Sequence, residues 1–158
     1  MRDFDDRAFR DALGHFTTGV TVVTTMTEDG PLGMTVNSFA SVSLDPPLVL
    51  WSPARHSDRF PAFEAASHFA IHVLNEDQAD LSMRFATTGT NFDGLDFSKG
   101  AGDAPLFEDC AARFECRHAA GYDGGDHLIV VGEVLRFDVP GGLPLLYHRG
   151  SYARLSRD

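Results

Sequence analysis

The sequence predicts a mainly β fold, an antiparallel barrel with a few peripheral helices. Three observations support this fold class: six or seven segments carry strand patterns, hairpin-length turns join most of them, and only two or three segments suit helices. A parallel crossover needs a dozen or more residues, so strands joined by short turns must run antiparallel. Closing such a sheet into a barrel is the economical way to remove its exposed edges.

The first predicted element is a helix from Asp5 to Phe16. Phe9, Leu13 and Phe16 recur at helical spacing, and acidic residues crowd the first turn, where the helix dipole favours them. Strand patterns, rich in β-branched and apolar residues, then follow along the chain. They cover residues 20–25, 32–39, 48–51, 68–74, 111–121, 127–139 and 145–147.

Two further helices are expected between these strands. One runs from Ser57 to Ala66, with Ser57 as its N-cap and Pro61 in an early turn. The other reaches Ala86 and opens with Asn75 and Gln78 as a capping pair. The stretch 87–102 is rich in Gly, Thr, Asp and Asn, and it is predicted to be a long surface loop. The turn signals Asp29-Gly30 and Asp123-Gly124-Gly125 mark two hairpins.

Composition narrows the class of protein. The 158 residues fit a single domain, 1–158, and 13 Phe suggest a core built on aromatic rings. A net charge of −10 disfavours binding to nucleic acid or to a membrane, although one local basic spot could still hold a small anion. The N-terminus lacks the apolar run of a signal peptide, so a cytoplasmic location is expected. Cys110 and Cys116 match no metal or redox spacing and are expected to be reduced and partly buried.

Several familiar sites are excluded by their spacing. The segment Gly14 to Gly19 has two glycines but lacks the Lys-Ser/Thr of a phosphate loop. His68 and His72 lie four apart on a predicted strand, so their side chains share one face about 13 Å apart, too far to bind one ion. We therefore expect no metal site, and we expect these two histidines to lie on a solvated strand face.

The segment Gly33 to Leu48 is unusual for a strand because Ser, Thr and Asn occupy both of its faces. One interpretation is a backbone that presents N–H and C=O groups, backed by short hydroxyls, to a flat polar heterocycle. The other is an edge strand that runs into a Ser-rich loop. The residues alone leave both interpretations open.

At this point the sequence resembles a known family. The resemblance is carried by four segments: Phe9 to Thr24, Gly33 to Leu50, Gly124-Gly125-Asp126-His127, and Pro144 to Tyr152. Together they resemble the flavin reductase-like, FMN-binding split-barrel family, from about Phe9 to Leu155. The specific part is Thr35-Val36-Asn37-Ser38-Phe39 followed by Asp45-Pro46-Pro47.

The resemblance implies a six-stranded antiparallel Greek-key split barrel that forms a homodimer with flavin near the interface. It implies an NAD(P)H:flavin oxidoreductase that reduces FMN or FAD, held non-covalently, with NADH or NADPH as hydride donor. The reduced flavin would then supply a partner monooxygenase. A non-catalytic flavin carrier or redox sensor on the same barrel is the competing hypothesis. A third is a relative of pyridoxamine-phosphate oxidases, whose signature is absent from the sequence.

The same resemblance assigns the site residues. The flavin ring would contact Gly33, Met34, Thr35, Val36, Asn37, Ser38 and Ser41, and its phosphate would contact Ser52, Pro53, Ala54, Arg55, His56 and Ser57. A second flavin contact is expected at Phe85 and Ala86, and His148, Arg149, Ser151 and Tyr152 would hold NAD(P)H. His127 is the candidate catalytic residue beside the nicotinamide.

Each assignment has a plainer alternative. Arg55 alone would be a solvated cation, Phe85 a core residue, His127 a structural histidine, and residues 148–152 a strand packed on the barrel. Trp51 departs from the family pattern and is bulky enough to alter the room for an adenine. Hydride transfer needs no buried general base, so the site should be poor in titratable groups.

Overall fold

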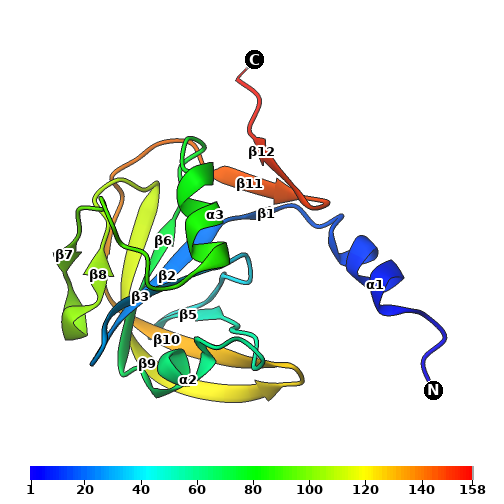
Figure 1. Cartoon of the computed structure of the whole chain (residues 1–158), viewed down its shortest axis with the longest axis horizontal. Helices are drawn as coiled ribbons and strands as arrows, with labels where there is room; N and C mark the ends of the chain where they lie inside the picture. The colour runs from blue at the N-terminus through cyan, green and yellow to red at the C-terminus, as the bar shows by residue number, and fades with distance from the viewer. Residues whose placement is uncertain (158) are drawn as a thin grey trace.

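The structure, a computed structural model that describes residues 1–157, is mainly β and antiparallel, as predicted (Figure 1). Seven strands form one sheet in the spatial order β3-β2-β6-β9-β10-β5-β4. Their bounds are β2 (Thr21–Thr27), β3 (Gly30–Val36), β4 (Ala40–Leu44), β5 (Pro47–Trp51), β6 (His68–Val73), β9 (Ala112–Gly124) and β10 (His127–Asp138).

Smaller elements surround this sheet. The strands β1 (Thr18–Gly19), β11 (Leu145–His148) and β12 (Ser151–Arg154) form a second sheet in the order β1-β11-β12, and β7 (Ser98–Lys99) pairs with β8 (Pro105–Leu106). The helices are α1 (Asp6–Leu13), α2 (Phe60–Ala65) and α3 (Ala79–Thr87), with a 3₁₀ turn at Ala101–Asp103. No helix in residues 1–157 has the length and apolar character needed to cross a bilayer.

The predicted count of six strands in the main sheet is wrong, because the sheet has seven. The additional strand is β4, which belongs to the polar segment that the residues left between a strand and a loop. The two edges of the sheet, β3 and β4, are consecutive in the chain and are joined by only three residues, Asn37, Ser38 and Phe39. Four residue steps span at most about 14 Å, so the sheet must curl until its edges approach each other.

Aromatic rings fill the core, as the composition predicts. Trp51 is fully buried and packs edge-on against Phe63 and Phe69, with ring centroids 5.2 and 5.8 Å away. Trp51 therefore cannot limit the room for an adenine, contrary to our expectation. Phe92 and Phe107 join a second cluster around Phe85. The stretch 87–102 is mostly irregular, as predicted for a surface loop, but it contains the short strand β7 and its Phe92 is buried.

The helix ends differ from the predicted ones. Ser57 is not the N-cap of α2; the N-cap is Arg59, whose N–H donates to the Ser57 hydroxyl, and Pro61 lies in the first turn as expected. Before α3, the Gln78 side chain does accept from the Asn75 N–H, but the helix begins only at Ala79. Each helix therefore begins two or three residues later than predicted. The side-chain hydrogen bonds expected at the helix ends are made in the loops before them, and helix boundaries are the least certain part of such a prediction.

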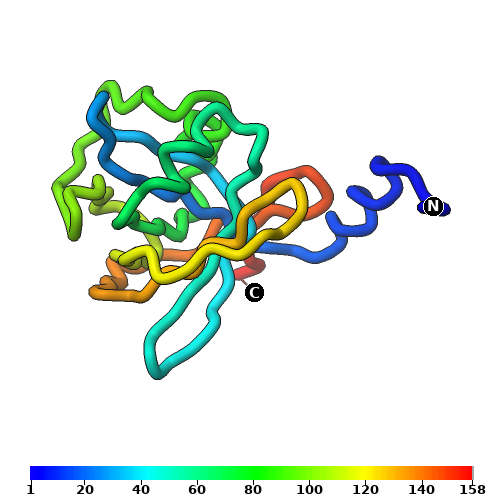
Figure 2. The backbone as a smooth tube through the Cα atoms, turned by 90° about the horizontal axis from the view of Figure 1, so that it is seen from below, coloured from blue at the N-terminus to red at the C-terminus, as the bar shows by residue number. Residues whose placement is uncertain are grey.

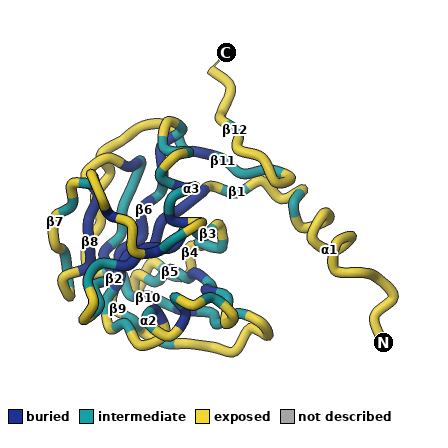
Figure 3. Tube along the Cα trace, viewed as in Figure 1, coloured by how far each residue is buried: buried dark blue, intermediate teal, exposed yellow. Residues whose placement is uncertain are grey.

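The N-terminal helix α1 is shorter than predicted, and just past its end the Gly14 carbonyl accepts from the Arg149 N–H at 2.9 Å. The helix extends away from the sheet in two orthogonal views (Figures 1 and 2), and Figure 3 shows it exposed along its length. None of its residues is buried, and Phe9, Leu13 and Phe16 are 49, 58 and 79% exposed. Its apolar face is therefore available for a partner.

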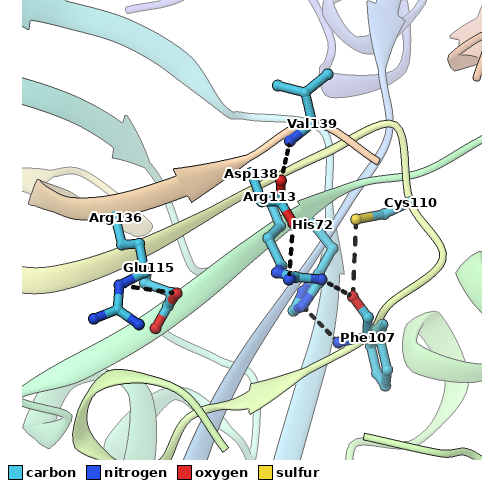
Figure 4. Close-up of polar contacts among 8 residues, drawn as sticks. All are labelled: His72, Phe107, Cys110, Arg113, Glu115, Arg136, Asp138 and Val139. Carbon is cyan, nitrogen blue, oxygen red and sulfur yellow. Dashed lines mark hydrogen bonds and ion pairs between the residues drawn. The ribbon is translucent and has the colours of Figure 1, made fainter. Parts of the chain in front are cut away.

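His72 is fully buried, so the prediction that it lies on a solvated strand face is wrong (Figure 4). The N–H of Phe107 donates to its Nε2 at 3.1 Å, which leaves Nδ1 to carry the proton and donate to the Val22 carbonyl at 3.0 Å. The neutral ring thus ties β6 and β2 to the segment after β8. Burial, assisted by the nearby Arg113 cation, lowers the pKa of His72 to about 4.

The two cysteines are free and fully buried. The Cys110 thiol points at the Phe107 carbonyl, which also accepts from Arg113 (Figure 4). Burial raises the pKa of Cys110 to about 11 and that of Cys116 to about 12. Both thiols are therefore unreactive at neutral pH, because only the thiolate is nucleophilic.

The buried histidine makes stability depend on pH. The unfolded chain binds a proton near the usual pKa of 6.5, whereas native His72 does so only near 4. Stability is therefore full above pH 6.5 and falls between pH 6.5 and 4, by on the order of 3 kcal/mol for this group. Urea unfolding from pH 8 to 4 measures this slope, which His72→Gln should flatten. The exposed His15→Gln is the control and should keep it.

A His72→Gln chain that does not fold would leave the native ring to be titrated directly by NMR. An imidazole of His72 that takes up its proton near pH 6.5 in the folded protein would contradict this account.

Candidate functional site

A pocket of about 210 Å³ lies at the end of β3, between the main sheet, α3 and the β11–β12 hairpin. We call it the β3 pocket. Residues from six elements or connections line it: Val20, Thr35, Val36, Asn37, Ser82, Ala86, Tyr147 and Tyr152. Five of these eight residues, Thr35, Val36, Asn37, Ala86 and Tyr152, are among the predicted site residues. The structure thus brings together segments that lie more than 100 residues apart in the sequence.

The end of β3 is held against α3 by close packing and by one arginine. A Cβ added to Gly33 would lie 2.6 Å from the ring of Phe85, so only glycine fits between the strand and this fully buried side chain. Nη1 of Arg59 donates to the carbonyl oxygens of Gly33 and Phe85, at 2.9 and 2.6 Å. Burial lowers the pKa of Arg59, partly offset by Asp58, yet the guanidinium keeps both bonds. The position of Thr35 to Asn37 is therefore firmly defined.

The connection after β3 contributes Asn37 to the lining of the pocket. Within the part of the chain that the structure describes, the N–H groups of Asn37, Ser38 and Phe39 donate to no backbone carbonyl. The Ser38 hydroxyl accepts from the Ser52 N–H at 2.9 Å, which joins this connection to the segment after β5. Free N–H groups beside a pocket are the donors that a polar heterocycle can use.

The segment after β5 pairs with the start of β10 instead of forming a separate loop. Ala54 bridges His127, and the Arg55 N–H donates to the Asp126 carbonyl at 2.9 Å. The turn between β9 and β10 has Gly125 and Asp126 at its centre, one residue later than predicted, with Gly125 at φ 75°. A single positive φ at the first central position suits Gly. Arg55 and His127, 72 residues apart, are thereby neighbours.

The side chains of Arg55 and His127 make polar contacts where this turn meets the segment after β5. Nη2 of Arg55 donates to Asp123 at 2.8 Å, and its Nε donates to the Gly125 carbonyl at 3.2 Å. Nδ1 of His127 lies 2.7 Å from Asp126, and this hydrogen bond and the His127 charge lower the pKa of Asp126. The other ring nitrogen of His127 remains available to a ligand. His56 is exposed on the same segment.

The C-terminal hairpin closes the other side of the β3 pocket. Tyr152 pairs edge-on with Tyr147, and its hydroxyl hydrogen-bonds the Ser82 hydroxyl on α3 at 2.7 Å. Ser82 in turn uses its carbonyl to accept from Thr35 at 2.6 Å. Three elements, β3, α3 and β12, are thus joined around the pocket by two hydrogen bonds.

Some predicted site residues lie outside the β3 pocket. The side chains of Met34, Pro53 and Phe85 are buried in the protein interior, and the Phe85 ring packs in a core cluster, so the flavin contact expected at Phe85 stays a prediction. Ser41 is exposed on β4, and Ser151 and Arg149 are exposed at the β11–β12 turn. His148 bonds Thr17 through Nδ1 at 2.7 Å, on the side of β1.

Sequence reasoning missed four contributors: Val20, Arg59, Ser82 and Tyr147. Arg59 lies two residues after Ser57, the last residue of the predicted phosphate segment, and this proximity was a usable signal. Ser82 gave none, because a serine within a helix is usually a solvent-facing residue.

A larger cavity of about 510 Å³ lies on the other side of α3. Its lining carries one cation, Arg84, among five carboxylates: Asp77, Asp80, Asp96, Glu108 and Asp109. Such a charge repels phosphate esters. It contains none of the predicted site residues, so the β3 pocket is the better candidate for a flavin.

Comparison with known proteins agrees with this geometry. The model of the flavin reductase like domain matches residues 13–156, and the chain belongs to this family. The FMN reductase (NADH) SmoA of Agrobacterium fabrum is 60% identical over 97% of this chain and 88% of its own length. The reductase component of a flavin-dependent trigonelline monooxygenase from Acinetobacter baylyi is 48% identical, and the chain spans only 48% of it.

Among solved structures, the NADH:FAD oxidoreductase SgcE6 of Streptomyces globisporus, in complex with NAD and FAD fragments, superposes with a TM-score of 0.91. It is 37% identical and the match covers 100% of this chain and 99% of that one.

Replacing Gly33 with Ala tests how the pocket wall is held. The added methyl would overlap the buried Phe85 ring, and such overpacking costs typically 1–3 kcal/mol. We expect a melting temperature several degrees lower and weaker flavin binding, because β3 must move away from α3. Gly19→Ala is the matched control, since a Cβ at Gly19 meets nothing within 4 Å. Equal melting temperatures for Gly33→Ala and wild type would contradict the packing argument.

Proposed function

We propose that the protein is an NADH-dependent flavin reductase that supplies diffusible reduced flavin to a partner monooxygenase. The observation that carries this proposal is the free main chain of Asn37 to Phe39 beside the β3 pocket, in a chain 60% identical to an FMN reductase (NADH). Arg55, after β5, and His127, at the start of β10, are neighbours beside the turn that follows β9. The named relatives that are monooxygenase reductase components support the partner.

The residues present suit a non-covalently held FMN or FAD. Thr35, Val36 and Asn37 would hold the ring, mainly through main-chain groups, with Ala86 and Tyr152 against it. Arg55 and Ser57 would hold the phosphate, since a guanidinium offers a forked pair of charge-assisted bonds. Gly33, Met34 and Phe85 would contribute through packing and backbone position alone. His148, Arg149 and Ser151 would contact the nicotinamide nucleotide from the β11–β12 hairpin.

When bound, the two cofactors supply the hydride donor and acceptor, so the protein's work is to position and polarise them. The N–H groups of Asn37, Ser38 and Phe39 can stabilise negative charge on a ring carbonyl, because oriented donors cost no reorganisation during the reaction. His127, which Asp126 orients, would lie beside the reacting rings in this proposal. Because its Nδ1–H donates to the Asp126 carboxylate, the free Nε2 of the neutral ring would accept a hydrogen bond there.

The β3 pocket needs no general base. None of its eight described lining residues is a carboxylate, an imidazole or a cation. This matches the expectation that the site is poor in titratable groups, and it favours hydride transfer over acid–base chemistry. A few main-chain bonds in a neutral pocket also suit modest affinity, which release of reduced flavin requires.

We further propose a homodimer whose second copy completes the site, with the curved sheet as the split barrel of the family. The β3 pocket, at about 210 Å³, falls below the roughly 300 Å³ at which ligand pockets begin. The chain also exposes Phe9, Leu13 and Phe16 on its N-terminal arm, residues 5–16, whose helix α1 has no buried residue. A second copy can cover these rings.

We propose a cytoplasmic location as well, because the two cysteines are free and free thiols suit a reducing compartment.

The reductase assignment predicts that NADH consumption depends on added flavin. Purified protein with NADH alone should show little loss of absorbance at 340 nm, and micromolar FMN or FAD should start steady oxidation in air. Under anaerobic conditions, flavin bleaching should follow instead. A carrier or sensor would bind flavin without consuming NADH, and that result would overturn the proposal.

The dimer predicts a consequence of removing the apolar face of the arm. Phe9→Ser with Phe16→Ser should lower the mass in light scattering from twice 17.2 kDa toward 17.2 kDa and weaken flavin binding. Arg7→Ser on the same helix is the control and should remain dimeric. A wild-type protein that is monomeric at micromolar concentration would contradict this part of the proposal.

A further inference from the structure

Arg55, the expected phosphate ligand, is held by the turn that follows β9. Its Nη2 donates to Asp123 at 2.8 Å, its Nε donates to the Gly125 carbonyl at 3.2 Å, and its guanidinium lies 5.7 Å from the centre of the Phe60 ring. These contacts fix the guanidinium at one place. The Arg55 side chain is 38% exposed, so a ligand can reach its remaining N–H groups.

Asp123 and a phosphate would compete for the same donors. Both are anions that accept from the planar guanidinium, and the outer edge that donates to Asp123 is part of the fork a phosphate would use. The Asp123 side chain is 82% exposed and can turn away without breaking any packing. While it stays, its negative charge also repels the phosphate at close range.

From this geometry we propose that Asp123 limits the affinity for phosphorylated flavins by competing with their phosphate for Arg55. This inference rests on the proposed function, since it takes Arg55 as the phosphate ligand. Asp123 is then a specificity-determining residue that keeps FMN exchangeable. It acts on the phosphate alone, so riboflavin, which has the same ring but no phosphate, is insensitive to it.

The size of the effect follows from the exposure of the pair. Exposed ion pairs contribute about 0.2–1 kcal/mol, so their removal changes a dissociation constant by up to roughly fivefold. We therefore expect Asp123→Asn to tighten FMN binding roughly two- to fivefold and to slow FMN dissociation accordingly. Arg55→Ala should weaken FMN binding roughly 5- to 150-fold, the range for losing a charge-assisted hydrogen bond.

The test is a double-mutant cycle read by equilibrium binding. Flavin fluorescence quenching gives dissociation constants for FMN and riboflavin in wild type, Asp123→Asn, Arg55→Ala and the double variant. Asp138→Asn is the matched control, because Asp138 is also an exposed acid paired with an arginine, Arg113, and its loss changes the net charge equally. The proposal expects Asp123→Asn to tighten FMN only, and to have no effect once Arg55 is absent.

The outcomes separate this inference from the proposed function. If Arg55→Ala weakens FMN but not riboflavin, while Asp123→Asn leaves FMN unchanged, the competition is overturned and the phosphate site stands. Equal tightening by Asp138→Asn, or equal tightening of riboflavin, also overturns it, because the effect would then be one of net charge or ring contact. If Arg55→Ala leaves FMN unchanged, the phosphate site and the competition fall together.

Discussion

The three-residue connection from Val36 to Ala40 joins the two opposite edges of a seven-stranded sheet, and the site depends on this constraint. A chain this short forces β3 and β4 to approach, so the sheet curls and Asn37 comes to line the β3 pocket. Among residues 1–157, the N–H groups of Asn37 to Phe39 find no backbone carbonyl to donate to. The packing of Gly33 on Phe85 and the Ser38–Ser52 bond hold the connection in place from its two sides.

Electrostatics then determine how tightly a flavin can be held. The chain carries a net charge of −10, and the cavity beyond α3 is lined by carboxylates. No charged side chain is among the described residues that line the β3 pocket, and the turn after β9 holds the Arg55 cation in place. If, as proposed, main-chain groups hold the ring and Arg55 holds the phosphate, the phosphate is bound by a cation that already has an acidic partner, and this suits a reductase that must release its product.

The sequence predicted the parts of this architecture that depend on local pattern. The antiparallel strands, the β2–β3 hairpin and the polar stretch from Thr35 to Ser38 all follow from residue types and spacing. What it could not predict depends on tertiary neighbours. His72 reads as a solvated residue until Phe107 and Val22 are seen to satisfy both ring nitrogens. Likewise, the pairing of Arg55 with Asp123 joins residues 68 apart, and no local signal announces it.

The N-terminal arm shows a second limit of the sequence. Its apolar spacing predicted a helix, but periodicity does not say against what an apolar face packs, and in this chain no residue of α1 is buried.

Hydrogen–deuterium exchange with and without saturating FMN tests the central claim most directly. If the connection between the sheet edges holds the flavin ring, exchange should slow most at the amides of residues 35–39 and, through the phosphate, at residues 52–57. The amides around the acidic cavity, at residues 107–109, should be unaffected. Unchanged exchange at residues 35–39, or protection centred on the acidic cavity, would contradict the account.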